Sequence, residues 1–281
     1  MIDYHAHLWP EKAAPEGIRA DLFRRKGKSS FTEDDLLGSM EQNGIDQTVI
    51  SALVFHKNMK NSEIKALNDH VRRAKNASLG KLKAFCTINP FEEGAENFLR
   101  NCMEEQGFDG LKLHCNMQEF YPDDIRLEPI YRRMEQYGKP ILFHSGGIGI
   151  LPYRDEFGRP IRFDAAASEH PGLTIILGHA GRIWYEETAM LLRKHKNVYA
   201  DISTNFGKNA ETEVYPMIQL LNTVKGWAGT TGHLLFGSDF PFYDQGKTKK
   251  LMERAAAAIG GNDICTAEDI QNILMNNHLN L

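Results

Sequence analysis

The stretch that decides the fold is residues 110–146, GLKLHCNMQEFYPDDIRLEPIYRRMEQYGKPILFHSG. Two short apolar runs, Gly110 to Leu113 and Pro140 to Phe143, lie on either side of Leu127 to Tyr137, where apolar residues have helical spacing. A proline suited to the first helical turn and a glycine suited to the helix end bound that segment. Strand, helix and strand in this order indicate a parallel βαβ unit.

The same alternation continues along the whole chain. The expected strands are Met1 to Ala6, Gln47 to Val54, Leu82 to Ile88, Gly110 to Leu113, Pro140 to Phe143, Leu173 to Leu177, Val198 to Ile202 and Leu234 to Phe236. The expected helices include Asn61 to Asn76, Glu92 to Gln106, Leu127 to Tyr137, Ile183 to Lys194, Glu211 to Val224 and Lys247 to Ile259. Eight such units predict an α/β fold, a (β/α)8 TIM barrel that forms a single domain over residues 1–281. A doubly wound open sheet is the alternative, but its glycine-rich phosphate turn is missing after the first strand.

Two segments exceed a minimal barrel. Leu8 to Phe31 is polar and predicts a long strand-1 loop over the barrel mouth, either as a lid or as ordinary loop packing. Thr266 to Leu281 predicts an extra C-terminal helix that seals one end of the barrel. Capping-box patterns at residues 32–35 and 266–269 mark two further helix starts.

Composition and charge exclude several classes of protein. The 281 residues are 42% hydrophobic and 25% charged, which is typical of a folded globular chain. A net charge of -4 provides no long-range positive field to attract a phosphate backbone, so we expect no nucleic-acid partner. No apolar run approaches the roughly 20 residues of a membrane span, and a secretory signal is absent, so we expect no membrane partner and a cytoplasmic location. The four cysteines form no CxxC pair and are expected to be free thiols. The oligomeric state stays open, and a homodimer is compatible with the sequence.

Residues that can bind a metal follow the expected strands. His5 and His7 lie at the end of the first strand, and their spacing points both imidazoles to the same side. His144 follows the fifth strand, His179 the sixth and Asp239 the eighth. One such residue alone is weak evidence, but in a barrel all of these strand ends converge on one mouth.

The combination of these residue types favours metal chemistry. Neutral imidazoles with one carboxylate suit Zn2+, Mn2+ or Fe2+ and leave open positions for water or substrate. Such an ion lowers the pKa of bound water from 15.7 toward ~7. A nearby carboxylate can then accept and return the proton.

Five motifs resemble the amidohydrolase superfamily over nearly the whole chain. They are DYHAH at 3–7, GLKLH at 110–114, GKPILFHSG at 138–146, IILGHAG at 175–181 and LLFGSDFP at 234–241. The similarity is to the amidohydrolase 2 branch related to aminocarboxymuconate semialdehyde decarboxylase. It implies one divalent metal, with zinc ranked before manganese, held by His5, His7, His144 and Asp239. It also implies that His179 and Asp239 are catalytic.

Lys112 leaves the number of metal ions open. Lys112 and His114 are expected to share the inward face of their strand. Other branches of the superfamily bridge two metals with a carboxylated lysine, so a second ion is expected only if Lys112 is carboxylated. Otherwise Lys112 neutralises the cluster or binds a substrate carboxylate. His114 either contacts substrate or makes a structural hydrogen bond.

Further residues are expected near the mouth. The predicted substrate-binding set is Trp9, Lys112, His114, Arg182 and Trp184, and His56, Asn89 and Asn205 also lie near the mouth. Arg182 either clamps a carboxylate or forms a surface ion pair. The two tryptophans either wall a small apolar or aromatic substrate or pack in the core or lid.

Three functions follow from this set. The first is metal-dependent hydrolysis of a small carbonyl, lactone or amide substrate, ranked first because it is the commoner reaction across the superfamily. The alternative is metal-dependent nonoxidative decarboxylation of an aromatic or unsaturated carboxylic acid. The third is a non-catalytic barrel that only binds a small molecule, which the intact ligand set disfavours.

Overall fold

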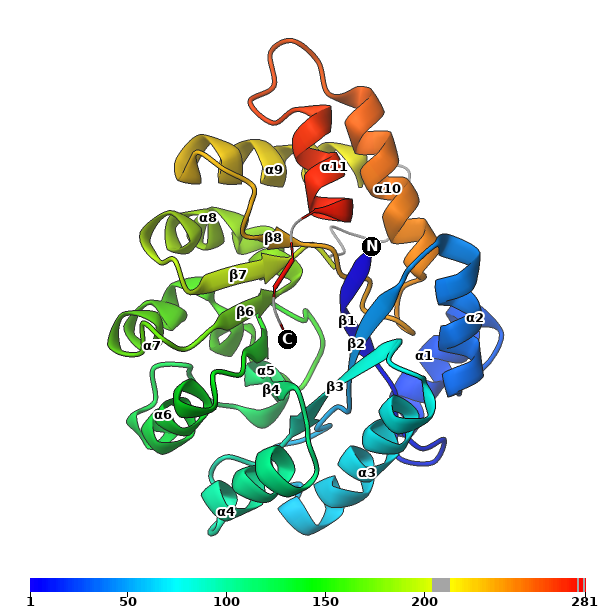
Figure 1. The fold of residues 1–281 in the computed structure, drawn as a ribbon, viewed down its shortest axis with the longest axis vertical. Helices are drawn as coiled ribbons and strands as arrows, with labels where there is room; N and C mark the ends of the chain where they lie inside the picture. The colour runs from blue at the N-terminus through cyan, green and yellow to red at the C-terminus, as the bar shows by residue number, and fades with distance from the viewer. Residues whose placement is uncertain (204–212, 277, 280) are drawn as a thin grey trace.

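A computed structural model describes residues 1–203, 213–276, 278–279 and 281 (Figure 1). Eight parallel strands form one sheet in chain order. They are β1 (Ile2–His7), β2 (Gln47–Ser51), β3 (Leu82–Thr87), β4 (Gly110–His114), β5 (Ile141–His144), β6 (Ile175–Gly178), β7 (Val198–Asp201) and β8 (Leu234–Leu235). The chain after β8 pairs with β1, because the Tyr4 amide donates to the Phe236 carbonyl at 2.9 Å and Ala6 bridges Phe240. The predicted (β/α)8 barrel is therefore confirmed.

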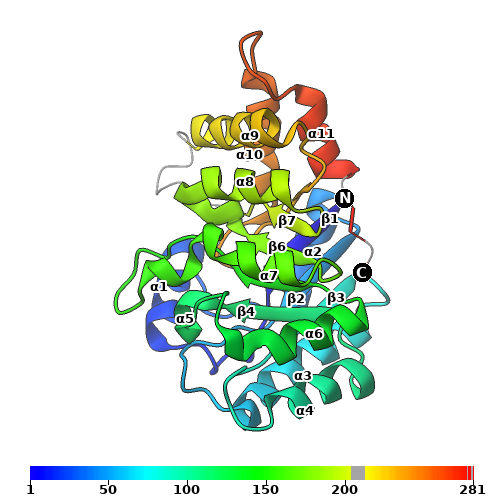
Figure 2. The ribbon, with the colours of Figure 1, turned by 90° about the vertical axis from the view of Figure 1, so that its left-hand side faces the viewer.

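Helices surround the strands on the outside (Figures 1 and 2). They are α1 (Glu16–Lys26), α2 (Glu33–Asn43), α3 (Asn61–Ala77), α4 (Ala95–Arg100), α5 (Cys115–Gln118), α6 (Glu128–Tyr137), α7 (Asp164–Glu169), α8 (Tyr185–Lys194), α9 (Val214–Ala228), α10 (Gln245–Ala258) and α11 (Ala267–Met275). The first residues of the helix expected from Glu211 lie outside the described residues. Both capping boxes are present, at Thr32 and Thr266. Within the described chain, every helix is too short or too polar to cross a bilayer.

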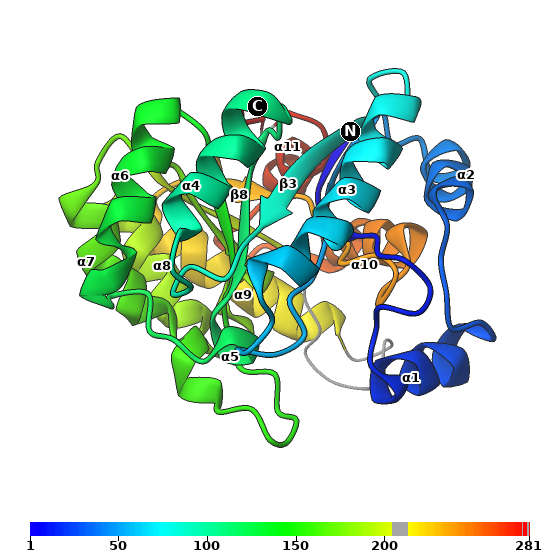
Figure 3. The same ribbon diagram turned by 90° about the horizontal axis from the view of Figure 1, so that it is seen from below.

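The first strand-to-helix connection contains a helix that the sequence analysis did not predict. In α1 only Leu22 is buried, so the segment lacks the apolar stripe by which helices are recognised. Leu22 packs in a small apolar cluster with Trp9, Ala14 and Phe55. This cluster fixes α1 beside the barrel at the end where β1 finishes (Figure 3).

The barrel interior is filled by side chains that alternate with outward-facing ones. In β1 the pairing shifts between Asp3, which pairs with Thr48, and Ala6, which pairs with Ile50, so β1 has one extra residue there. This bulge turns both Tyr4 and His5 inward, which strict alternation would not allow. The inward layer below the site consists of Tyr4, Val49, Phe85, Leu142, Ile176 and Leu235.

The C-terminal tail closes the opposite end of the barrel. Leu279 and Leu281 pack against the inward apolar layer, and the Leu279 amide donates to the Tyr4 hydroxyl at 2.8 Å. The extra helix α11 is present as predicted, but it lies beside α10 (Figure 1). The tail after α11, and not the helix itself, therefore contacts the barrel interior.

Candidate metal centre

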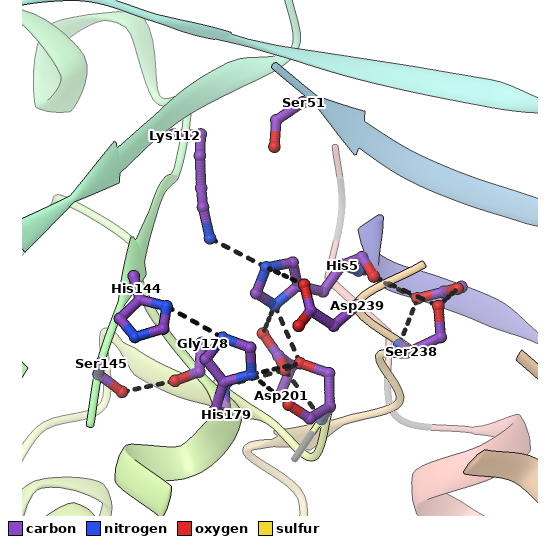
Figure 4. A network of polar contacts seen from close by, with 12 residues as sticks. His5, Ser51, Lys112, His144, Ser145, Gly178, His179, Asp201, Ser238 and Asp239 are labelled. Carbon is purple, nitrogen blue, oxygen red and sulfur yellow. Dashed lines mark hydrogen bonds and ion pairs between the residues drawn. The ribbon is translucent and has the colours of Figure 1, made fainter. Parts of the chain in front are cut away.

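The polar residues expected at the strand ends do meet at one end of the barrel (Figure 4). His5 and His7 come from β1 and His144 from β5. His179 directly follows β6, and Asp239 follows Gly237 and Ser238 in the chain after β8. Each of the five is at most 5% exposed. Their chemistry is therefore shielded from bulk water.

Three of the four predicted ligands converge closely. Nε2 of His5 lies 3.1 Å from Nε2 of His7, and Oδ1 of Asp239 lies 3.8 Å and 3.3 Å from these two nitrogens. Bonds of about 2.0–2.2 Å to one ion place its ligand atoms roughly 3–4 Å apart. His5, His7 and Asp239 thus fit a common divalent metal ion.

The partners of the two imidazoles indicate which nitrogens carry protons. Nδ1 of His5 lies 2.9 Å from the Asp201 carboxylate, and Nδ1 of His7 lies 3.3 Å from the Ser51 carbonyl oxygen. Each Nδ1 is therefore assigned as a donor, and each Nε2 presents a lone pair. Two lone pairs 3.1 Å apart beside a carboxylate need a cation. The Lys112 ammonium is such a cation, because its Nζ lies 2.9 Å from His5 Nε2. A divalent ion would compete with this ammonium for the lone pair on His5 Nε2.

His144 stands beside this group and not within it. Its Nδ1 lies 3.1 Å from Nε2 of His179, while Nδ1 of His179 donates to the Ser203 carbonyl. Nε2 of His144 is fully buried and has no partner among the described residues. A buried polar atom without a partner is costly, so this atom fits a role as a metal ligand. The inclusion of His144 in the ligand set stays a prediction.

Asp201, at the end of β7, was missed by the sequence analysis. It accepts from Nδ1 of His5 at 2.9 Å and from the backbone amides of His179 at 3.1 Å and Ser203 at 3.0 Å. Burial would raise the pKa of Asp201, but interactions with His5, His179 and the Ser203 hydroxyl hold it well below its usual range. The signal was present, because Asp201 ends an apolar strand just as His144 does. With His5 and His179, Asp201 forms a second close group of metal-binding type.

The backbone beside the site adopts costly conformations. His179 has φ 63° and Asp239 has φ 62°, in the left-handed region that non-glycine residues rarely enter. Hydrogen bonds hold both turns: Asp201 accepts from the His179 amide, and Asp3 accepts from the Ser238 amide at 2.9 Å. Such conformations cluster at functional sites, where the surroundings compensate for the strain.

Burial also sets the charge states. It lowers the pKa of His7 to about 4 and the pKa values of His144 and His179 well below their usual range, so these rings are neutral donors of lone pairs. It lowers the pKa of Lys112 to about 8. Burial would raise the pKa of Asp239, yet its interactions with His7, His179 and His5 together outweigh burial and keep the carboxylate ionised.

The predicted substrate-binding residues lie at different distances from this centre. Lys112 is inside it. Arg182 is half-buried, donates to the Gly147 carbonyl at 2.8 Å, and leaves its Nε buried without a partner in the described chain. A surface ion pair is therefore the wrong interpretation of Arg182 within the described residues. Burial is the main cause of the lowered pKa of His179, and the positive charge of Arg182 lowers that pKa further.

The aromatic candidates belong to the rim. Trp9 is buried against Phe55 and Phe242, and Phe242 faces His7 at 6.3 Å between ring centroids. Trp184 is half-buried beneath the Arg159 guanidinium at 5.4 Å. Of the other residues placed near the mouth, His56 is exposed, Asn89 donates to backbone carbonyls of the β2 connection, and Asn205 lies outside the described residues.

A second cluster of ligand-type residues lies outside the barrel. Glu128, Glu169 and His170 approach one another there. Both ring nitrogens of His170 already have carboxylate partners, Glu128 at 2.6 Å and Glu135 at 3.3 Å. This cluster joins α6 to the chain after α7 through hydrogen bonds.

Comparison with known proteins gives a consistent result. A family model described as amidohydrolase matches residues 2–277. The fold resembles 5-carboxyvanillate decarboxylase from Sphingomonas paucimobilis, with 14% identity, coverage of 98% of this chain and 96% of that chain, and a TM-score of 0.69. It also resembles dihydroxybenzoic acid decarboxylase from a Polaromonas species, solved with bound manganese and the inhibitor 2-nitroresorcinol. Here the identity is 18%, the coverage is 99% of this chain and 97% of that chain, and the TM-score is 0.68. A third similar structure is that of 4-oxalomesaconate hydratase from Rhodopseudomonas palustris, with 19% identity, coverage of 98% of this chain and 93% of that chain, and a TM-score of 0.60. A search of curated protein sequences found no match.

Proposed function

Because the chain belongs to the amidohydrolase family, we propose that it is a metal-dependent, nonoxidative decarboxylase of an aromatic or unsaturated carboxylic acid. This reverses the order of the two reactions in the sequence analysis, which ranked hydrolysis first on frequency alone. Two of the structural relatives named above are decarboxylases of aromatic acids, and this likeness supports the proposal. The proposed ligands are His5, His7, His144 and Asp239.

The observation that carries the proposal is the charge balance of the buried centre. Asp201 and Asp239 bring two negative charges, which one divalent ion would balance, and the buried Asp3 adds a third above a pH of about 6, which leaves one net positive charge when the two cations beside the centre are counted. Lys112 and Arg182 then remain as cations beside neutral imidazoles. A buried excess of positive charge favours an anionic substrate. A carboxylate meets this requirement, whereas a neutral lactone or amide does not.

The side chains divide the work of the reaction. A bound divalent ion would supply Lewis-acid stabilisation of negative charge on substrate oxygens. Lys112 and Arg182 hold the substrate carboxylate, and the low exposure of the centre limits the access of bulk water. The bond between the carbon and the carboxylate breaks, CO2 leaves, and a new C–H bond forms with one proton. Asp239 takes that proton from solvent and delivers it to the carbon, while His179 stabilises the charge that develops.

The test is a substrate panel on the metal-restored enzyme. Protein loaded with Zn2+ or Mn2+ is mixed with 2,6-dihydroxybenzoate, 5-carboxyvanillate and unsaturated diacids, and CO2 release is followed. Lactones and amides are assayed in parallel for acid release. We expect CO2 from at least one acid, loss of this activity in Asp239→Asn, and full activity in Asp34→Asn, which changes an exposed carboxylate on α2. Hydrolysis without any CO2 release would restore hydrolysis as the first interpretation, and inactivity on every compound would favour the binding-only barrel.

A further inference from the structure

We propose that His114, at the end of β4, binds the substrate carboxylate through a hydrogen bond donated by its Nε2. The inference rests on the proposed function for the class of substrate. The sequence analysis gave two alternatives for the His114 ring, a contact with substrate or a structural hydrogen bond.

The tautomer of His114 is set by its own backbone. The amide of Met117 donates to Nδ1 of His114 at 3.3 Å, so this side chain caps the start of α5. Because Nδ1 accepts a hydrogen bond, the proton of the neutral ring lies on Nε2. His114 is thus held as a donor at Nε2, in contrast to His5 and His7, whose Nε2 atoms present lone pairs.

This N–H donor has no hydrogen-bond partner among the residues that the structure describes. No group in the described chain makes a hydrogen bond with Nε2 of His114, and this atom is not among the fully buried unpartnered atoms. The ring stacks on His144 at 4.0 Å between centroids with an interplanar angle of 10°. One edge of the ring is therefore fixed by the cap, one face by His144, and the N–H edge remains for a ligand.

The position of His114 on β4 indicates what it binds. His114 and Lys112 are two residues apart on one strand, so both side chains project into the barrel. An ammonium and a neutral N–H on the same face form a donor edge beside the candidate metal centre. An acceptor-only group of negative charge, such as a carboxylate, matches such an edge.

Two substitutions separate the cap from the donor. In His114→Asn the amide oxygen can replace Nδ1 as the cap, since asparagine is a good N-cap, but nothing replaces Nε2. In His114→Gln the longer amide brings an N–H near the place of Nε2 and loses the cap. We expect His114→Asn to keep the thermal midpoint of the wild type and to raise the KM for the acid roughly 10- to 100-fold, the range of a lost hydrogen bond to a charged group. We expect His114→Gln to lower the thermal midpoint and to retain most of the affinity.

A binding experiment keeps this inference apart from the proposed reaction. Benzoate is titrated into wild type and both variants, with the metal content of each measured beforehand. Weaker benzoate binding in His114→Asn with unchanged metal content supports the inference even if the wild type releases no CO2 from any acid, an outcome that would contradict only the proposed reaction. Equal benzoate affinity of His114→Asn and wild type would overturn the inference and leave His114 as a cap. Failure of benzoate to bind the wild type would overturn it as well.

Discussion

Replacement of Asp201 by asparagine should reduce metal affinity although Asp201 is not among the predicted ligands. Its carboxylate accepts from Nδ1 of His5 at 2.9 Å, and this keeps the lone pair of His5 on Nε2. An asparagine can present its NH2 group to Nδ1, which would move the ring proton to Nε2 and remove the ligand. The substitution also deletes one of the two buried negative charges that face the ion.

The magnitude follows from the type of contact. Loss of a carboxylate that orients a metal-binding histidine costs about 10- to 100-fold in affinity, or roughly 1.4–2.7 kcal/mol. The geometry favours the upper part of this range, because Asp201 is fully buried and also holds the amide of His179 at 3.1 Å. Equilibrium dialysis with Mn2+, followed by elemental analysis, measures affinity and stoichiometry together.

The control is Asp34→Asn, which removes an exposed carboxylate on α2 and should leave Mn2+ affinity unchanged. Circular dichroism must first show that Asp201→Asn is folded. A folded Asp201→Asn protein that binds Mn2+ as tightly as the wild type would refute the reasoning. A fall from two ions to one at unchanged affinity would instead identify Asp201 as a ligand of a second ion with His5 and His179.

Three further predictions concern residues around His5 and Asp201. His179→Ala should keep about one metal per chain and lose on the order of 10²–10⁴ in kcat, and loss of bound metal together with activity would contradict the single-ion assignment. Lys112→Met should bind the divalent ion at least as tightly as the wild type, since the ammonium 2.9 Å from His5 no longer competes, whereas a drop in stoichiometry would indicate a carboxylated, bridging lysine. Burial raises the pKa of Asp3 from 3.8 to about 6, so in the metal-free protein the contribution of Asp3 to the free energy of unfolding should fall by about 3 kcal/mol as the pH rises from about 4 to about 6, while the buried histidines with lowered pKa values contribute in the opposite direction. Urea titrations across this range should show that the wild type loses about 3 kcal/mol of stability relative to Asp3→Asn, and an identical pH dependence of the two proteins would contradict the role of Asp3.

The barrel could be predicted because its local and global patterns agree. All eight expected strands overlap the observed ones, and β5 (Ile141–His144) differs from its prediction by one residue at each end. The helix α6 begins with a proline in its first turn and ends at Gly138 in the left-handed conformation, as the sequence indicates. Parallel strands buried on both faces leave continuous apolar runs, and these are the strongest signal in such a chain.

The first connection and the first strand show where that signal fails. Helix α1 has one buried residue, so its stability comes from contact with the rim and not from a pattern in its own sequence. The bulge in β1 depends on how β1 pairs with β2. Neither feature is encoded over a few neighbouring residues, and both need the assembled barrel.

The candidate site could be predicted in part for a related reason. Metal-binding residue types at strand ends are visible in the sequence, but their partners are not: Asp201 is 196 residues from His5 and lies on β7, with β8 between them. Gly237, after β8, leaves room for this contact, since a Cβ there would lie 3.0 Å from Oδ1 of Asp201. Gly178 on β6 leaves room for the His5 ring, since a Cβ there would lie 3.0 Å from Cε1 of His5. The glycines that precede His179 and Asp239 by one and two residues are therefore part of the site, because a side chain at either position would crowd the His5–Asp201 contact inside the barrel.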